Sequence, residues 1–389
     1  MTDSNKKTIF SGVQPSGNLH IGNYIGALSQ WAELQNQYDC IFCVVDYHAI
    51  TVKQDPKELN KRIIEIVKHY LASGIDPKKS VIFQQSDVSA HTELAWILNT
   101  IARNSDLTKM TQFKEKSGIQ TGVDDADKIL DEMTGKNFGG FNDILAKWVN
   151  KKELTIEEVT LLRSVIITDI GIGLKKFNSV GVGLYDYPVL MASDILLYDT
   201  DAVPVGDDQV QHVELTRTLA RRFNQQFGET FKVPEVVIRK EGARIMGLDD
   251  PKIKMSKSAA STANYIALSD SPEAAAKKIM RAVTDSGKDI RFDKTDKPAI
   301  SNLLTIYSVL GKTSIRELEN KYKNKGYSDF KKDLAEAVKI FLINYQKKFN
   351  RYSDDEIKNI LKAGAARIEP LAKKTLLKTK KQLGLYIKK

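Results

Sequence analysis

A turn followed by a helix, close to the start of the chain, carries residues suited to binding an anion. Residues 14–17 end a β-branched, apolar stretch, and helical spacing of apolar residues begins at Ile21, directly after His20. Unpaired backbone N–H groups and the positive end of the helix dipole make such a junction a site for phosphate. Gly22 and Gly26 leave one side of the helix open to a flat base or ribose. The pattern is neither Gly-x-Gly-x-x-Gly nor a P-loop, which indicates a nucleotide site of another kind.

A second stretch, residues 254–258 (KMSKS), could bind the same kind of group. Its two lysines supply point charge, while the serine hydroxyls and the backbone N–H groups supply hydrogen bonds. The preceding residues 247–251, GLDDP, are typical of a turn, so the stretch is expected in a loop. Because lysine is mostly exposed in any protein, an ordinary solvated loop is an equally good interpretation of this stretch alone.

A carboxylate stands in the middle of an otherwise apolar helical run. Asp194 interrupts residues 189–197, VLMASDILL. Burying a carboxylate without a partner is costly, so the pattern indicates that Asp194 is paired with a hydrogen-bond donor. The alternative is a helix carboxylate that reaches solvent or a nearby amide.

The elements that must position these residues alternate between strand and helix. Composition predicts amphipathic helices between strands at 8–13, 39–45, 80–84, 202–205 and 233–238. This alternation predicts an α/β fold with a doubly wound parallel sheet, in which ligands bind at the carboxyl ends of the strands. The polar and glycine positions that fall at such ends are Gln14, His20, Asp46, His48, Gly206 and Asp208.

Beyond Ser261 the apolar spacing is helical only, which predicts a C-terminal all-helical domain. Residues 311–389 hold 21 Lys and Arg against 9 Asp and Glu, while the whole chain carries a net charge of +10. A solvated helical surface accounts for this basic excess as well as a polyanion such as RNA does. The predicted division of the chain is 1–117 and 181–262 for the two halves of the α/β domain, 118–180 for a helical insertion, and 263–389 for the helical domain.

Composition excludes several other classes of protein. The 389 residues contain no run of 18 apolar residues and no signal-peptide pattern, which predicts a cytoplasmic protein with no membrane span. Cys40 and Cys43 have no second pair and no His cluster nearby, so they are expected to be buried thiols on opposite faces of a strand rather than zinc ligands.

Taken together, residues 14–17, HIGN at 20–23 and KMSKS at 254–258 resemble the paired signatures of class I aminoacyl-tRNA synthetases. The first signature departs from the common HIGH tetrad at Asn23. Within that class, the longer strings resemble the tryptophan-specific family; they are FSGVQPSG, VDYHAIT, MTQFKEKS, YPVLMASDILLY, VPVGDDQVQH and GARIM. So many strings in one order exclude coincidence, and the resemblance covers residues 10–258 and continues through AVTDS and ISNLL.

This resemblance implies a Rossmann-like catalytic domain and a two-step reaction. L-tryptophan and ATP would give tryptophanyl-adenylate and pyrophosphate, and the tryptophanyl group would pass to the terminal adenosine of tRNA(Trp). Mg²⁺ would accompany ATP, and the basic C-terminal helices would meet the tRNA anticodon. Because the substrate carboxylate is already an anion, the protein would align it and stabilise charge rather than supply a general base.

Roles follow from the resemblance position by position, with no residue assigned to a metal. The expected catalytic residues are Gln14, His20, Lys254 and Lys257. The expected ATP contacts are Gln14, Pro15, Ser16, His20, Gly22, Asn23, Lys116, Gly206, Asp207, Asp208, Ile245, Lys254, Met255, Ser256, Lys257 and Ser258. The expected tryptophan contacts are Phe10, His48, Tyr187, Met191, Asp194, Val203, Val205 and Gln209. An indole N–H only donates, and a carboxylate only accepts, which suits Asp194 to that ring.

Two features leave alternatives open. The family has a short connection where this chain has residues 118–180, and its members are usually homodimers, so the insertion could extend the dimer interface, cover the tRNA acceptor end or pack only on its own domain. In that insertion, Thr155 and Glu158 have the spacing of a capping box. The activity could instead be that of the tyrosine-specific relative, or of a catalytically silent protein that binds tRNA or nucleotide.

Overall fold

The computed structural model gives the structure of most of the chain. It describes residues 6–15, 17, 19–108, 110, 147, 155, 156, 158–160, 181–206, 209–238, 244–257, 259 and 261–386. Outside these ranges lie nearly all of the predicted insertion and five predicted site residues, Ser16, Lys116, Asp207, Asp208 and Ser258. The predicted capping box is confirmed, because Glu158 N donates to Thr155 Oγ1 at 3.1 Å and Thr155 N donates to Glu158 Oε2 at 2.9 Å.

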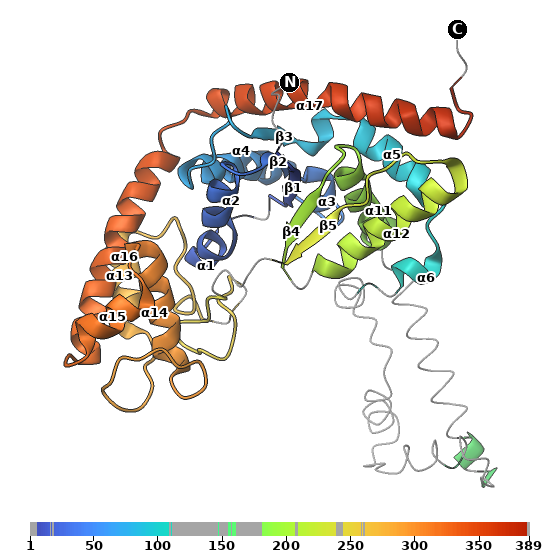
Figure 1. Cartoon of the computed structure of the whole chain (residues 1–389). Coiled ribbons are helices and arrows are strands. Elements are labelled where there is room, and N and C mark those ends of the chain that lie inside the picture. The colour runs from blue at the N-terminus through green and yellow to red at the C-terminus, as the bar shows by residue number, and fades with distance from the viewer. Residues whose placement is uncertain are drawn as a thin grey trace.

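A parallel sheet forms the centre of the molecule, as the alternation of elements predicts (Figure 1). In the described part of the chain its strands are β1 (Thr8–Val13), β2 (Asp39–Val44), β3 (Val81–Gln84), β4 (Ala202–Val205) and β5 (Glu235–Ile238). Their order is β3-β2-β1-β4-β5, and every neighbouring pair is parallel. The chain therefore changes direction across the sheet between β1 and β4, which is the position where α/β sheets open a crevice for ligands.

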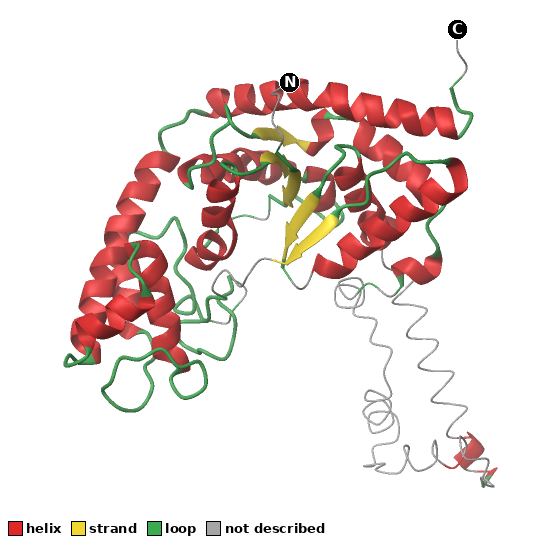
Figure 2. Cartoon of the chain, in the orientation of Figure 1, coloured by secondary structure: helices red, strands yellow, loops and turns green. Residues whose placement is uncertain are grey.

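Helices cover both faces of this sheet (Figure 2). They are α1 (Ile21–Asn23), the π-helical η1 (Tyr24–Leu28), α2 (Ser29–Leu34), α3 (Asp46–Ala49), α4 (Pro56–Ala72), the 3-10 helix η2 (Gln85–Asp87), α5 (Ala90–Asn99), α6 (Asn104–Leu107), α11 (Val182–Leu196) and α12 (Val210–Phe227). The start of α4 is well capped, because the Asp55 side chain accepts from the backbone of Lys57 and Glu58 and Pro56 occupies the first helical position.

The helix predicted to begin at Ile21 contains a π-helical segment, η1, between its first turn and α2. π-Helical turns are rare and are found mostly at functional sites. Sequence spacing does not reveal this one, because the buried residues Ile25, Leu28 and Trp31 keep a spacing of three residues through it.

The two cysteines lie on opposite faces of β2, as predicted. Cys43 belongs to the buried cluster that contains Phe10 and Leu94, whereas Cys40 belongs to the cluster that contains Trp31. Burial, together with the charge of Asp39, raises the pKa of the Cys40 thiol to about 12, so it stays protonated.

The C-terminal region is helical, with α13 (Pro272–Arg281), α14 (Pro298–Gly311), α15 (Ile315–Tyr322), α16 (Tyr327–Phe349) and α17 (Asp354–Gln382). α13 to α16 form their own core, which Met255 joins from the α/β part. α17 instead runs back along the sheet (Figure 1), where Ile368 and Leu376 belong to the same buried cluster as Phe10. By packing, α17 therefore belongs to the α/β domain rather than to the helical domain predicted for residues 263–389.

A glycine lets α17 cover the edge strand of the sheet. A Cβ atom at Gly364 would lie 1.8 Å from the carbonyl oxygen of Ile82 in β3, a distance at which the backbone must move. An uncovered edge strand exposes unpaired backbone groups, so this close approach protects β3.

We expect Gly364→Ala to lower the free energy of unfolding by roughly 1–3 kcal/mol, because overpacking outweighs the better helix propensity of alanine. Urea unfolding followed by circular dichroism measures this change. Gly183→Ala in α11 is the matched control, because its nearest contact would be Thr51 Cγ2 at 3.8 Å. A Gly364→Ala protein as stable as the control would contradict the close packing.

Candidate active site

Asp194, in α11, is the centre of a buried hydrogen-bond network. Its residue exposure is 1%. His48 Nε2 lies 2.9 Å from Oδ2, and His91 Nδ1 lies 2.6 Å from Oδ1. Gln85 Nε2 lies 2.7 Å from Oδ1 and 2.9 Å from Oδ2. The carboxylate therefore does not reach solvent, and its partners are one amide and two imidazoles.

The donors come from segments that follow two neighbouring strands. His48 lies in α3 after β2, while Gln85 begins η2 after β3. The Gln85 side chain is oriented by its oxygen, which accepts from the backbone N–H of Tyr47 at 3.1 Å, so its amide nitrogen faces Asp194. Parallel strands end at the same edge of a sheet, and this is why residues 103 to 146 positions before Asp194 meet at its carboxylate.

The charge state of Asp194 follows from these partners. Burial alone raises the pKa of a carboxyl group, but the electrostatic interaction with His91 and the hydrogen bonds from His48 and His91 outweigh it. The pKa of Asp194 therefore lies well below its ordinary value, and the group is an ionised acceptor. An ionised carboxylate in an apolar pocket suits recognition of a ring N–H.

Several residues predicted for the tryptophan pocket share a buried cluster with residues of α11, the helix that carries Asp194. Phe10, Val203 and Val205 belong to one buried cluster, and the partly buried Met191 packs against it. The ring of Tyr187 lies edge-on to His48 with centroids 6.0 Å apart, and its hydroxyl lies 2.8 Å from His212 Nε2. Gln209 stands at the start of α12, beyond β4.

The phosphate-binding residues predicted from the first turn lie at the start of α1. His20 directly precedes α1, and its backbone N–H donates to Asn23 Oδ1 at 3.0 Å. Asn23 therefore caps the helix that begins at this site. At the end of β1, Gln14 Nε2 donates to the backbone oxygen of His48 at 3.5 Å, which joins this region to the Asp194 network.

The KMSKS loop packs against the same helix start. Met255 is 2% exposed, and a Cβ atom at Gly22 would lie 3.5 Å from its sulfur and 2.9 Å from the His20 ring. A Cβ atom at Gly17 would lie 3.3 Å from the ammonium of Lys257. The KMSKS loop thus brings the ammonium of Lys257 close to the turn that precedes this helix, an arrangement suited to polyphosphate.

The loop is held in place by its own backbone contacts. Met255 N donates to the oxygen of Ile245 at 3.0 Å, so the predicted residue Ile245 supports the loop. Ser256 N donates to Asn264 Oδ1 at 3.0 Å, and the same amide donates to Asp249 at 2.6 Å. The remaining predicted residues that are described, Pro15 and Gly206, lie directly after β1 and β4.

His20 is neutral at physiological pH. Burial, and then the charge of Lys254, lower the pKa of its imidazole to about 4. The effect of Lys254 shows that the first lysine of the loop also lies close to the helix start. A neutral imidazole can donate or accept a hydrogen bond but adds no positive charge of its own.

Sequence reasoning missed three residues of the Asp194 network: Gln85, His91 and Tyr198. Tyr198 Oη lies 2.6 Å from His91 Nε2, and both residues are buried. One sequence signal does exist for His91. It stands three residues before Leu94, so helical spacing puts this polar side chain on the apolar face of the helix, where it needs a hydrogen-bond partner.

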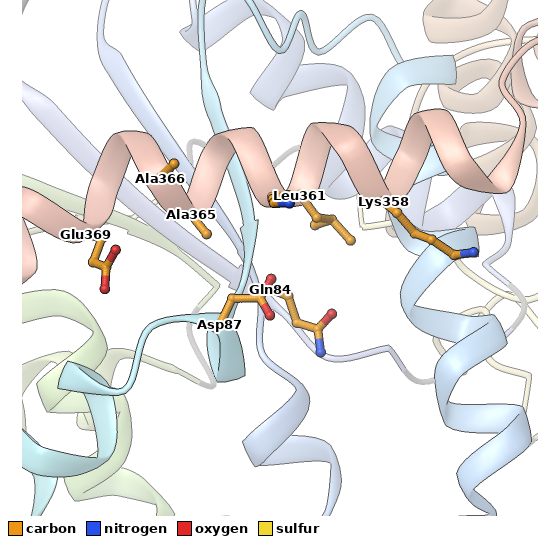
Figure 3. Close-up of a pocket in the computed structure, with 8 residues that line it drawn as sticks. Gln84, Asp87, Lys358, Leu361, Ala365, Ala366 and Glu369 are labelled. Atoms are coloured by element: carbon orange, nitrogen blue, oxygen red, sulfur yellow. The ribbon is translucent and has the colours of Figure 1, made fainter.

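A cavity of about 480 Å³ opens elsewhere, between α17 and the end of β3 (Figure 3). Its lining consists of Gln84, Asp87, Lys358, Leu361, Lys362, Ala365, Ala366 and Glu369. None of these is a predicted site residue. In the described ranges, no three His, Cys, Asp or Glu side chains gather as a metal site, and no helix has the length and apolar character to cross a membrane.

Comparison with known proteins gives a family match over most of the chain. The family described as class I tRNA synthetases (W and Y) matches residues 2–130 and 168–343. The unmatched residues 131–167 lie inside the predicted insertion. The tryptophan–tRNA ligase of Caldanaerobacter subterraneus subsp. tengcongensis is 47% identical over 382 residues, covering 98% of this chain and 99% of the relative. That of Bacillus subtilis is 45% identical over 381 residues, covering 98% of each chain.

Solved structures give the same match. Tryptophanyl-tRNA synthetase from Mycoplasma pneumoniae aligns with a TM-score of 0.76 at 34% identity, over 98% of both chains. The Campylobacter jejuni enzyme complexed with ADP and tryptophan aligns with a TM-score of 0.70 at 31% identity, over 97% of this chain and 99% of that one. A tyrosyl-tRNA synthetase from Archaeoglobus fulgidus, at 18% identity and a TM-score of 0.56 over 89% of this chain and 91% of that one, shares the fold alone.

The proximity of the loop to the helix start can be measured through His20. We expect Lys254→Gln to raise the pKa of His20 above about 4, because the change removes a nearby positive charge. Titration of the imidazole signals by NMR, with ¹³C-labelled histidine, measures it. His69 is the internal control, since burial alone lowers the pKa of its imidazole to about 4. A His20 signal that titrates identically in both proteins would place Lys254 away from the helix start.

Proposed function

This chain belongs to the class I tRNA synthetases of the tryptophan and tyrosine family, and we infer that within it the chain is a tryptophan–tRNA ligase. It activates L-tryptophan with ATP to tryptophanyl-adenylate and transfers the tryptophanyl group to tRNA(Trp). Relatives named for this activity match nearly the full chain at 43–47% identity, which disfavours both the tyrosine-specific and the silent alternatives. The observation that carries the proposal is the buried, ionised Asp194 at the carboxyl edge of the sheet.

We propose that Asp194 accepts the indole N–H of tryptophan. The support is chemical, since a buried carboxylate can only accept and an indole nitrogen can only donate. His48 donates to Oδ2 at 2.9 Å, and the indole N–H would replace that donation when tryptophan enters. Phenylalanine offers no donor, so Oδ2 would lose the His48 hydrogen bond without a replacement, and a pocket built to pair a substrate N–H rejects such a substrate strongly.

The rest of the tryptophan pocket follows from the residues around Asp194. The proposed contacts are Phe10, His48, Tyr187, Met191, Val203, Val205 and Gln209. Their support is that the apolar members share one buried cluster and that the Tyr187 ring lies against His48. A flat, largely apolar pocket with one buried acceptor suits a large aromatic ring with a single N–H.

ATP is proposed to lie between the start of α1 and the KMSKS loop. Gln14, His20, Gly22, Asn23 and the lysines 254 and 257 would contact it, with the other predicted ATP residues around them. The support is the approach of Met255 to Gly22 and of Lys257 to Gly17. Neutral His20 would bind by hydrogen bond, while the two lysines neutralise charge on the leaving pyrophosphate.

Mg²⁺ is proposed to enter with ATP, because it is commonly held by substrate phosphates together with one or two carboxylates. Bound there it would neutralise negative charge on the phosphate oxygens. The protein's own part is alignment: the substrate carboxylate attacks the α-phosphorus directly, so no side chain need remove a proton.

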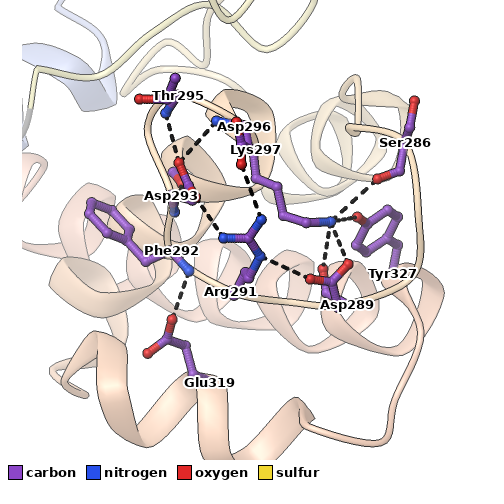
Figure 4. Close-up of polar contacts among 11 residues, drawn as sticks. Ser286, Asp289, Arg291, Phe292, Asp293, Thr295, Asp296, Lys297, Glu319 and Tyr327 are labelled. Carbon is purple, nitrogen blue, oxygen red and sulfur yellow. Dashed lines mark hydrogen bonds and ion pairs between the residues drawn. The ribbon is translucent and has the colours of Figure 1, made fainter.

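The tRNA is proposed to contact the basic C-terminal helices. Part of the charge in this region is already paired, since Arg291 is bonded to Asp289 and Asp293, and Lys297 to Asp289 (Figure 4). Exposed lysines on other elements, including Lys347 and Lys348 at the end of α16, are better placed to meet phosphates.

A homodimer is also proposed. Trp96, on α5, is 73% exposed, and a large aromatic ring at the surface is typical of a protein–protein interface. The predicted cytoplasmic location and the role of the insertion 118–180 stay predictions.

Pyrophosphate exchange tests the activity and the role of Asp194 together. Wild-type protein should exchange pyrophosphate with ATP in the presence of tryptophan, and not with tyrosine alone. Asp194→Asn should lower kcat/KM for tryptophan roughly 10- to 150-fold, the worth of a hydrogen bond to a charged group, with the KM for ATP nearly unchanged.

Asp186→Asn is the matched control, because Asp186 lies on the same helix and is bonded to Asn99 at 2.8 Å, outside the network. Equal losses toward tryptophan and ATP in Asp194→Asn would show that Asp194 is not the indole acceptor.

Binding of tRNA(Trp) should weaken steeply with salt, because phosphate contacts release counterions. Three phosphate contacts would raise Kd roughly 20- to 40-fold between 50 and 200 mM salt. Filter binding or fluorescence anisotropy measures the slope. A Kd that does not respond to salt would contradict the proposed basic surface.

A further inference from the structure

A chain of buried polar groups stands behind Asp194, away from the proposed tryptophan pocket. Tyr198 Oη lies 2.6 Å from His91 Nε2, and His91 Nδ1 lies 2.6 Å from Asp194 Oδ1. The three residues are each at most 1% exposed. Ser193 Oγ also donates to the backbone oxygen of His91 at 2.6 Å, which fixes the position of α5 against α11.

The chemistry of these groups fixes the direction of each hydrogen bond. An ionised carboxylate cannot donate, so the proton between His91 and Asp194 belongs to Nδ1 of the imidazole. In a neutral imidazole the other nitrogen, Nε2, is then an acceptor. Burial raises the pKa of Tyr198 well above its ordinary value, so its hydroxyl keeps its proton and can donate to Nε2.

The two oxygens of Asp194 have different surroundings. Oδ1 faces His91 at 2.6 Å and Gln85 at 2.7 Å, the two shortest contacts of the carboxylate. Oδ2 faces His48 and Gln85, both at 2.9 Å. Since His48 is a proposed tryptophan contact, Oδ2 is the oxygen on the substrate side.

We propose that Tyr198 and His91 are positioning residues that set specificity for the indole N–H. Tyr198 keeps the His91 proton on Nδ1, His91 then holds Oδ1, and Oδ2 is left pointing at the ring nitrogen of the substrate. This inference rests on the proposed role of Asp194 as the indole acceptor. It deepens that role, because neither positioning residue touches the substrate.

The physical reason is the torsional freedom of a carboxylate. Without His91, only the Gln85 amide holds Oδ1, so the carboxylate rotates more easily about Cβ–Cγ and Oδ2 meets the indole N–H at a poorer angle. Hydrogen bonds weaken steeply with angle, so loss of the anchor should cost selectivity for the N–H while leaving the apolar contacts to the ring intact.

The test uses a substrate that differs from tryptophan in one atom. In β-(benzothiophen-3-yl)alanine a sulfur replaces the indole N–H, so the ring shape is nearly retained but the donor is lost. The quantity to measure is the ratio of kcat/KM for tryptophan to kcat/KM for this analogue, in pyrophosphate exchange with the full-length protein. The wild-type ratio should be roughly 10 to 150.

Tyr198→Phe removes only the hydroxyl, and we expect it to lower this ratio about 2- to 10-fold, through the tryptophan KM and with the analogue's kcat/KM unchanged. Tyr70→Phe is the matched control. Tyr70 is fully buried in another cluster, and its hydroxyl has no hydrogen-bond partner within the described residues, so its removal should leave the ratio unchanged.

A second pair of variants keeps the proposal testable if one protein folds poorly. His91→Asn retains a donor close to the position of Nδ1, whereas His91→Leu removes it. The ratio should therefore be highest in the wild type, lower in His91→Asn and lowest in His91→Leu.

The outcomes distinguish the positioning role of Tyr198 and His91 from the role of Asp194 as the indole acceptor. Equal losses toward both substrates in Tyr198→Phe, or no loss at all, would overturn the positioning role, since packing alone would explain them. A wild-type ratio near one, or a ratio unaffected by Asp194→Asn, would overturn the proposed indole acceptor itself.

Discussion

A buried carboxylate that must not lose its partners is the constraint on which this site depends. Leaving Asp194 unpaired in the interior would cost several kcal/mol. The fold meets this constraint with donors from α3, which follows β2, and from η2 and α5, which follow β3, so all three elements are fixed relative to α11. The hydrogen bonds that keep the charge stable therefore also keep the pocket in shape, and the stability and specificity of this region cannot be separated.

The order of the strands explains why the proposed ATP site lies beside the proposed tryptophan pocket. β1 is central, with β2 on one side and β4 on the other, and the crevice between β1 and β4 opens where the turn after β1 leads to α1. The loop that carries Met255 and Lys257 reaches that helix start from the C-terminal side of the chain. Two contacts hold this loop: Met255 packs in the core of the helical region, and Ser256 N donates to Asn264 Oδ1. They link the proposed ATP site to α13–α16 rather than to the sheet.

Much of this arrangement could be predicted from sequence, and the rest could not for physical reasons. The parallel sheet follows from alternation, and Asp194 is conspicuous because it interrupts an apolar run. His91 and Tyr198 are not conspicuous: a histidine at a helix start and a tyrosine at a helix end are ordinary on a surface. Their role depends on the burial of both residues beside Asp194, which only the tertiary structure shows. The packing of α17 on β3 could not be predicted for a similar reason. In sequence, a glycine such as Gly364 within a helical pattern indicates lower helix propensity, and it does not indicate a close contact with a strand.

The spacing of the two halves of the site is set by a single strand. Phe10, a proposed tryptophan contact, lies in β1, and Gln14, a proposed ATP contact, directly follows the same strand. Four residues of extended chain span about 13 Å, and β1 cannot stretch because both of its edges are paired, with β2 and with β4. In the proposed complex, an amino acid held by its ring at one end of this strand therefore has its carboxylate at a fixed distance from the phosphates. The sheet would then supply the alignment of the two reacting groups, which is the source of rate enhancement that the proposed mechanism requires.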